Sequence, residues 1–401
     1  MSEIIISRQP ILDKKLRSYG YHIFFKRADN QEVTPDDLAQ TFTEIDLERL
    51  IGNNIGFFEI SREIADSQIL NIFPSDKVSF TLGKDWLKAD VMHYIEKLKE
   101  NDFSVHLDYM HKKECFPIYN FVDYIFINVK NFTTLELEEI VDLLSMVRGL
   151  KVAKSIETKE QFQELTKIGF DLYEGNFFAK PKIIKEKTID VSKTALLELY
   201  TKLKDFEDLN SIEETFKKNP DLSIKLLKYV NSAAFSFRSR ITSIKHALAL
   251  LGQKELLKWT LLALYQSDDF PTEQNPLMEM AAIRGKIMEI LATKMDNFSK
   301  EEVEESFLTG VLSLSDVAFN LDMETIIKEL NLSQDIADAL LERKGKIGKL
   351  LHIVENLEKI EETDLDSLKK IVSDMNLTLN DVLNAEMEAY FWVNDINNEL
   401  V

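Results

Sequence analysis

Residues 219–252 read NPDLSIKLLKYVNSAAFSFRSRITSIKHALALLG, and this stretch decides the fold of the second half of the chain. Asn219 can cap a helix that begins at Pro220, where the missing N–H group costs nothing. Apolar side chains then recur at helical spacing up to position 230. A second apolar helical pattern follows Ser243, and Gly252 suits the left-handed position beyond its end. The stretch therefore predicts a helix–loop–helix inside an all-helical module.

This run closely resembles the hallmark pattern of HDOD domains, NPxLSxKLLxxVNSAxF followed by ISSIxxAxxLLG. The resemblance implies a helical bundle that is related to metal-dependent HD phosphohydrolases but is typically used as a regulatory module. From about residue 191 the sequence keeps helical periodicity to its end. We therefore expect an HDOD helical domain over residues 186–401, after a charged junction at residues 180–190.

Composition limits the class of protein. A chain of 401 residues is long enough for two or three domains. It has 49 basic and 69 acidic residues, and the net charge of −20 disfavours nonspecific binding to nucleic acid or anionic lipid. The single cysteine, Cys115, fits a reducing cytosol, and we expect it to be a half-buried hydrophobe. We see no signal peptide and no apolar run of membrane-spanning length, so we predict a cytoplasmic protein without membrane insertion.

The first half of the chain alternates between two kinds of segment. Strand-like segments lie at residues 3–8, 21–25, 56–60, 77–82, 104–107, 124–129, 151–155 and 172–178. Helix-like segments lie at residues 35–51, 62–71, 84–100, 134–148 and 159–168. Such alternation is typical of a parallel α/β fold, and eight strands favour a TIM-like barrel. Only a short polar loop separates the first two strands, so we expect these to form an antiparallel hairpin.

A second resemblance covers residues 3–181. The segment RQPILDKKLRSYGYHIFFKR resembles the opening of EAL domains, the barrels that hydrolyse cyclic di-GMP. SVHLDYM resembles the family's ALDDFG, and YIFINVK resembles its IKID strand. VAKSIETKEQFQELTKIGFDLYEGNFFAKP resembles the tail AEGVETxEQ…LGxDxxQGxxFxxP. The resemblance implies an EAL-type barrel over residues 1–185, with helices trimmed because the region is short for the family.

The EAL resemblance supplies a chemical test. An EAL phosphodiesterase needs a ring of carboxylates at the carboxyl ends of its strands, which hold divalent cations that activate water. The family's site positions are occupied here by His22, Glu59, Asp108, Tyr109, Phe126, Asn128, Glu157 and Glu174. In the family they hold, in the same order, glutamate, asparagine, two aspartates, lysine, aspartate, glutamate and glutamine. Asp108 and Glu157 therefore keep the family's residue, and most of their partners are replaced.

These replacements remove the ligands that a metal pair requires. Strand 77–82 carries no carboxylate, and Tyr109 and Phe126 would crowd the site with apolar bulk. We therefore predict no bound metal, no cofactor and no enzymatic activity. The same losses argue against binding of cyclic di-GMP. We interpret the retained Asp108 and Glu157 as structural carboxylates.

The sequence of the helical half likewise predicts that a family metal site is absent. An HD hydrolase needs adjacent histidine and aspartate on one helix, as in GLLHDIG, because together they ligate a metal. The counterpart here is GVLSLSD, residues 310–316, with Ser313 and Leu314 in place of the pair. Neither side chain is a ligand for a hard cation, so metal-dependent hydrolysis is not expected from this half either.

Other side chains leave two interpretations open. His246 and His352 lie in predicted helices, either as pH-sensitive or ligand contacts or as packing residues. The loop of the signature stretch carries aromatic and arginine side chains, a composition typical of protein-interaction hot spots. These candidate partner-binding residues are Phe235, Phe237, Arg238 and Arg240. Alternatively, the phenylalanines fill the core and the arginines are solvated.

Taken together, the two halves resemble bacterial EAL–HDOD signalling proteins, in which the tail ALLxRxGxxGxLLxxVExxE recurs, here at residues 339–358. The resemblance predicts an inactive signalling adaptor that works by contact with other signalling proteins, in a cyclic di-GMP-linked or motility and attachment pathway. One alternative is a degenerate effector that binds cyclic di-GMP without hydrolysis. Another is a residual cyclic di-GMP phosphodiesterase.

Overall fold

The structure is a computed structural model of the 401-residue chain. It describes residues 4–82, 91–111, 113–179, 191–205, 207–231, 241–265, 275–319, 321–360 and 363–400. The chain divides into two compact units, which we call the barrel unit and the helical unit. The barrel unit comprises Met1–Lys180 and Glu358–Leu365, and the helical unit comprises Pro181–Leu357 and Asp366–Val401. The domain border expected between residues 185 and 186 lies outside the described residues and stays a prediction.

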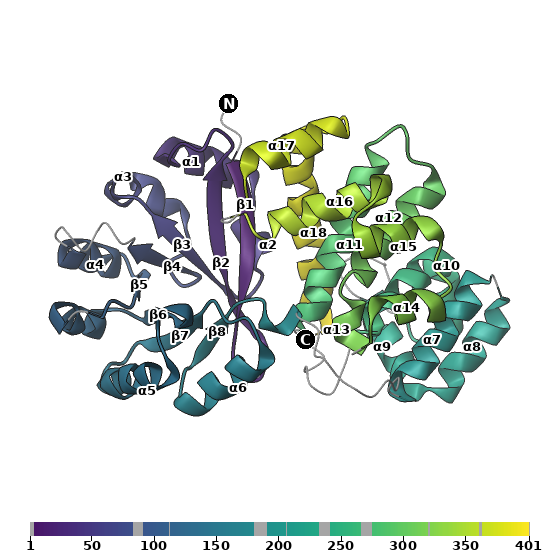
Figure 1. Cartoon of the computed structure of the whole chain (residues 1–401), viewed down its shortest axis with the longest axis horizontal. Helices are drawn as coiled ribbons and strands as arrows, with labels where there is room; N and C mark the ends of the chain where they lie inside the picture. Colours follow the sequence, from purple (N-terminus) through teal and green to yellow (C-terminus); the bar gives the residue numbers. More distant parts are fainter. Residues whose placement is uncertain are drawn as a thin grey trace. The chain divides into compact units, whose positions relative to one another are not determined.

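The described part of the barrel unit contains eight strands that close into a barrel in chain order (Figure 1). The strands are β1 (Ile4–Leu12), β2 (Ser18–Arg27), β3 (Ile55–Ile60), β4 (Val78–Leu82), β5 (Ser104–Asp108), β6 (Tyr124–Asn128), β7 (Leu150–Lys154) and β8 (Leu172–Glu174). β1 runs antiparallel to both β2 and β8, and each other neighbouring pair is parallel. This confirms the predicted TIM-like barrel and its opening hairpin.

Short helices connect the parallel strands on the outside of the barrel (Figure 1). They are α1 (Pro35–Glu44), α2 (Leu47–Ile51), α3 (Arg62–Asp66), α4 (Val91–Glu100), α5 (Thr134–Leu143) and α6 (Lys159–Ile168), with 3-10 turns η1 (Gln68–Ile72), η3 (Lys113–Phe121), η4 (Val129–Asn131), η5 (Leu144–Met146) and η6 (Phe177–Ala179). The helix expected over residues 35–51 is two helices. Asp46 breaks it, because its side chain accepts hydrogen bonds from the amides of Glu48 and Arg49 and so caps α2.

Side chains from five strands form an apolar core inside the barrel. A buried apolar cluster joins Ile11, Phe57, Tyr124, Phe126, Val152 and Leu172. Side chains two positions further along a strand point to the same face. The next inward positions toward the carboxyl end are therefore Glu59, Thr81, Asp108, Asn128, Lys154 and Glu174. We call these six residues the inner ring.

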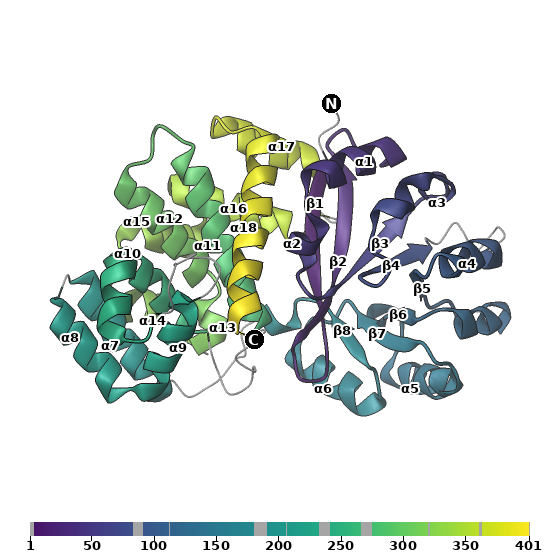
Figure 2. The ribbon, with the colours of Figure 1, turned by 180° about the vertical axis from the view of Figure 1, so that it is seen from behind.

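The helical unit consists of packed helices in its described residues. They are α7 (Val191–Lys204), α8 (Leu209–Lys218), α9 (Pro220–Val230), α10 (Ile244–Ala263), α11 (Pro276–Thr293), α12 (Lys300–Leu312), α13 (Ser315–Phe319), α14 (Met323–Glu329), α15 (Gln334–Glu342), α16 (Gly345–Leu357), α17 (Leu365–Asp374) and α18 (Leu379–Leu400). The C-terminal helix α18 packs along α11 (Figure 2). This agrees with the predicted helical bundle.

Two local predictions in the signature stretch have different outcomes. Gly252 has a positive φ of 69°, as expected, and it kinks α10 into two parts. Asn219 was expected to cap α9, but its side chain makes no capping hydrogen bond there. Its amide instead donates to the carbonyl of Thr215, at 2.8 Å. Because α8 ends where α9 begins, Asn219 satisfies the end of the first helix rather than the start of the second.

Helices α11 and α12 cross at two glycines. A Cβ atom added to Gly310 would lie 2.6 Å from the Cα atom of Gly285, a separation that real Cβ atoms do not tolerate. The two backbones therefore meet without intervening side chains. Separately, none of the described helices combines the length and apolar character needed to cross a membrane. The cytoplasmic location stays a prediction.

Candidate functional site

The inner ring lies at the carboxyl end of the barrel, where enzymes of this architecture place their sites. Asn128 at the end of β6 is paired in register with Lys154 at the end of β7. The next strand, β8, pairs with β7 and ends at Glu174. Asp108 ends β5 next to β6. Glu174 is buried, Asp108, Asn128 and Lys154 are half-buried, and Glu59 is exposed. The site positions of the first half are thus gathered at one edge.

His22 and Glu174, which replace the family's glutamate and glutamine, contact each other. The Nδ1 atom of His22 lies 3.4 Å from each carboxylate oxygen of Glu174, and both side chains are buried. Burial raises the pKa of Glu174, but the positive charge of Lys154 and the contact with His22 outweigh it, so that the pKa lies below its usual 4.5. The buried carboxylate is therefore held in its ionised form.

A second histidine lies beneath this pair. His106 on β5 accepts or donates a 3.0 Å hydrogen bond between its Nδ1 atom and the hydroxyl of Ser79, and its buried Nε2 atom has no hydrogen-bond partner. Burial lowers the pKa of His106 well below 6.5, which keeps the ring neutral. Phe126, at the family's lysine position, packs 4.8 Å from His106 and 5.8 Å from His22 between ring centroids. Apolar bulk therefore fills the floor of the site, as predicted.

The retained carboxylate Glu157 lies at the rim in an ion pair. Its Oε1 atom is 2.5 Å from the ammonium of Lys130, and both side chains are about half exposed. Within the described ranges, no group of three or more His, Cys, Asp or Glu side chains is arranged to hold a metal ion. The side chains present thus do not fit the divalent cations that the EAL resemblance implies.

An aromatic cluster borders the same end of the barrel, on the segments that follow β5 and β6. Tyr109 stacks on the buried Tyr119 at 5.7 Å between centroids, and Phe132 lies edge-on to Tyr109 at 6.0 Å. His111 is exposed and lies 6.3 Å from Phe132. Tyr109 and Phe132 are half-buried, so their rings are partly open to solvent. We call Tyr109, His111 and Phe132 the aromatic rim.

Sequence reasoning had missed two parts of this site. Tyr109 of the aromatic rim was identified as a family site position, but His111 and Phe132 were not, because the rim is assembled from two separate loops. Lys154 did have a signal: matching VAKSIET to the family's AEGVET places this lysine at a glutamate position. The inner ring therefore has a positive charge where the resembled family has a negative one.

In the helical unit, an arginine is hydrogen-bonded to Ser313, the position at which HD hydrolases carry the histidine of their metal-binding pair. Arg284 on α11 donates from Nη1 to the hydroxyl of Ser313 at 2.8 Å, and both side chains are buried. The same nitrogen lies 3.9 Å from Glu355, which also forms a two-bond ion pair with Arg343. Leu314, at the second dyad position, is buried among apolar side chains. A guanidinium thus supplies the positive charge at this place.

The remaining candidate residues have different outcomes. His246 and His352 are both exposed, so neither is a packing residue; His352 contacts Asn356. Cys115 is half-buried, as expected. The candidate partner-binding residues Phe235, Phe237, Arg238 and Arg240 lie outside the described residues.

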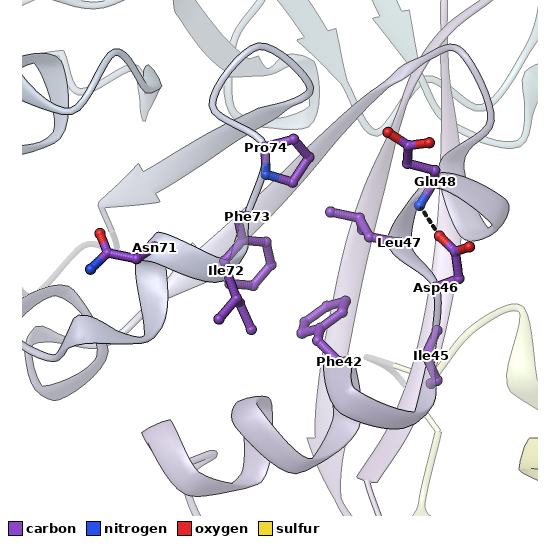
Figure 3. A pocket seen from close by; sticks show the side chains of 9 residues that line it. All are labelled: Phe42, Ile45, Asp46, Leu47, Glu48, Asn71, Ile72, Phe73 and Pro74. Carbon is purple, nitrogen blue, oxygen red and sulfur yellow. Dashed lines mark hydrogen bonds between the residues drawn. The ribbon is translucent and has the colours of Figure 1, made fainter.

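A separate hollow opens at the opposite, amino end of the barrel (Figure 3). It has a volume of about 480 Å³ and lies between the segments that precede β3 and β4. Its lining residues are Phe42, Ile45, Asp46, Leu47, Glu48, Asn71, Ile72, Phe73 and Pro74. None of the candidate site residues of the barrel lines it.

Comparison with known proteins finds one domain family and two relatives that match nearly the whole chain. Residues 196–344 match the HDOD domain model. The chain is 25% identical over 414 residues to the cyclic di-GMP phosphodiesterase CdgJ of Vibrio cholerae, which spans 98% of this chain and 93% of the relative. It is 21% identical over 411 residues to the uncharacterized protein YuxH of Bacillus subtilis, covering 98% of each chain.

Solved structures that resemble the chain include EAL proteins. One is BlrP1 of Klebsiella pneumoniae in a calcium and cyclic di-GMP complex, with a TM-score of 0.37, 13% identity, and coverage of 44% of this chain and 55% of that one. Another is the FimX EAL domain of Pseudomonas aeruginosa bound to cyclic di-GMP, with a TM-score of 0.35, 14% identity, and coverage of 45% and 90%.

Two predictions need correction. The prediction that the chain is not an enzyme is contradicted by CdgJ, a relative along nearly the whole chain that is named a phosphodiesterase. The prediction that cyclic di-GMP does not bind is contradicted by the same relative, which is named for that nucleotide. The physical error was to equate loss of cation ligands with loss of the nucleotide, since stacking and side-chain charge also hold nucleotides.

The chain is therefore similar, along nearly its whole length, to a relative that is named for cyclic di-GMP. An eight-stranded barrel precedes a helical unit. The chain carries an HDOD domain in that helical unit, and its domain order is that of the EAL–HDOD signalling proteins that it resembles.

Proposed function

We propose that this chain is a signal-transduction protein that recognises cyclic di-GMP at the carboxyl end of its barrel. The observation that carries the proposal is the similarity to CdgJ along 98% of the chain, which includes the whole barrel. The inner ring and the aromatic rim lie at the carboxyl edge, whereas the large hollow lies at the amino edge. The carboxyl end is therefore the place where we expect the nucleotide.

The aromatic rim gives this recognition a physical basis. Nucleobases stack on aromatic side chains because every base presents a flat π face, and one such contact is worth about 1–3 kcal/mol. His111 is exposed, and Tyr109 and Phe132 are half-buried, so a guanine can approach their rings without unfolding the loop. The polar inner ring then lies next to the bound base, on the strand ends β5 and β6.

Isothermal titration calorimetry of the full chain with cyclic di-GMP tests this proposal. We expect His111→Ala and Tyr109→Ala to weaken binding by about 5- to 100-fold, from the stacking energy. The control is Phe121→Ala, which removes an exposed aromatic ring from the segment that precedes β6, at the amino edge. Absence of binding by the wild-type chain, or equal loss in the control, would contradict the proposal.

Hydrolysis of cyclic di-GMP is a second candidate, favoured by the phosphodiesterase name of the relative. The retained carboxylates Asp108 and Glu157 are the residues to test. Formation of linear dinucleotide with added Mg²⁺ or Mn²⁺, followed by chromatography, would support this activity if Asp108→Asn abolishes it. No product from the wild-type chain would reject it and leave recognition of the nucleotide as a separate question.

For the helical unit we propose a role in protein contact, in a pathway linked to cyclic di-GMP such as motility or attachment. The support is the HDOD match and the aromatic and arginine composition of the segment with Phe237 and Arg240. Capture of partner proteins from the native cell by the full chain and by a Phe237→Ala, Arg240→Ala variant tests it. Undiminished capture by the variant would remove this segment as the contact surface.

A further inference from the structure

We propose that the ammonium of Lys154 takes the place of the divalent cation in the barrel, so that cyclic di-GMP is recognised without a metal ion. The inference rests on the proposed recognition of the nucleotide and names a residue that performs it. It concerns the inner ring alone and is independent of the aromatic rim.

The position of Lys154 follows from its strand. It is the last residue of β7, paired in register with Asn128 of β6. Val152, two residues earlier, belongs to the buried cluster inside the barrel, so the side chain of Lys154 starts from the same inward face. Lys154 is half-buried there.

The charge of Lys154 acts on groups deep in the barrel. It lowers the pKa of Glu174 and also that of His106, although burial has the larger effect on both groups. The ammonium is therefore within electrostatic reach of the carboxylate at the end of β8 and of the histidine beneath it. In this proposal it serves as a tethered cation of the inner ring, at the end of β7.

A cation is needed at this point because the ring also contains negative charge. Glu59, Asp108 and Glu174 belong to the inner ring, and a phosphodiester that approaches them is repelled unless a positive charge lies between. Lysine is a compact point charge that suits phosphate. A divalent ion at the same place would be repelled by the ammonium, which lies where the AEGVET motif of the resembled family has its first glutamate.

The test compares affinities of the intact chain for cyclic di-GMP with excess EDTA and with Mg²⁺. The wild-type chain is expected to bind equally under both conditions. Lys154→Met, which keeps the length and loses the charge, is expected to weaken binding by about 10- to 100-fold, whereas Lys154→Arg stays within a few-fold. The matched control is Lys151→Met near the amino end of the same strand, where the ammonium lies 2.9 Å from Asp171, and this variant is expected to change affinity little.

Two results would overturn the inference while the proposed recognition stands. One is a wild-type affinity that falls about tenfold or more in EDTA, and the other is a folded Lys154→Met variant that binds like the wild type. Absence of binding by the wild type under both conditions would instead remove the proposed recognition itself. The comparison of wild type with and without EDTA needs no variant, so the test survives if Lys154→Met fails to fold.

Discussion

The arginine that replaces the HD metal site makes a prediction about stability. Arg284 donates from Nη1 to the hydroxyl of Ser313 at 2.8 Å in a buried environment. A hydrogen bond to a charged group contributes about 1.5–3 kcal/mol, so Ser313→Ala is expected to lower the free energy of unfolding by about that amount. Arg284→Met should cost about 3 kcal/mol, because Glu355 then loses the nearby guanidinium of Arg284 and keeps its ion pair with Arg343.

The assay must separate the two units, since a two-domain chain does not unfold in one step. The chain has three tryptophans, and Trp259 and Trp392 both belong to the helical unit. In a Trp86→Phe background, tryptophan fluorescence during urea unfolding therefore reports on the helical unit. The four proteins of the double-mutant cycle are the background, Arg284→Met, Ser313→Ala and the double variant.

We expect a coupling energy of about 1.5–2 kcal/mol between Arg284 and Ser313. The control is Ser306→Ala on the same helix, a buried serine whose hydroxyl donates to the carbonyl of Glu302. It should not couple with Arg284. A coupling below about 0.5 kcal/mol for Ser313 would refute the idea that the guanidinium holds α11 to α12 at the former metal position.

Two further predictions concern the same unit. Gly310→Ala should destabilise it by about 1–3 kcal/mol, because the new methyl group would lie 2.6 Å from the backbone of Gly285; an unchanged urea midpoint would show that the helices can separate at no cost. Hydrogen bonds from Lys294 and Thr378 lower the pKa of Asp381 from 3.8 to about 2, so this group stabilises the fold above pH 3.8 and loses that contribution as the pH falls through 2. Lys294→Met should therefore cost about 0.5–1 kcal/mol at pH 7, after allowance for solvent screening, and almost nothing near pH 2; an equal cost at both pH values would contradict the assignment.

The strands of the barrel could be predicted because each is a short apolar run between polar turns, and the parallel order follows from the helices between them. The errors arise where one side chain decides between two local structures. Apolar periodicity runs through residues 35–51, but the Asp46 carboxylate starts a new helix there. Asn219 has the right identity for a cap, yet the end of α8 lies close enough to take its amide.

The site was predicted only in part, for a physical reason. Motif matching located the positions of His22 and Glu174, but their contact depends on barrel closure between β1 and both of its neighbours. The same is true of Arg284, which lies 29 residues from Ser313 in sequence. Counting the lost ligands identifies which metal ions the site can no longer bind as the family does. It does not identify the side chains that now supply the positive charge.

Hydrogen–deuterium exchange of the full chain with and without cyclic di-GMP tests most directly where the nucleotide binds. We predict protection of residues 108–111 and 128–133, which follow β5 and β6 at the carboxyl end of the barrel. Residues 45–48 and 71–74, which line the hollow at the amino end, should exchange at the same rate in both samples. Protection confined to the amino end, or none anywhere at saturating nucleotide, would contradict the account.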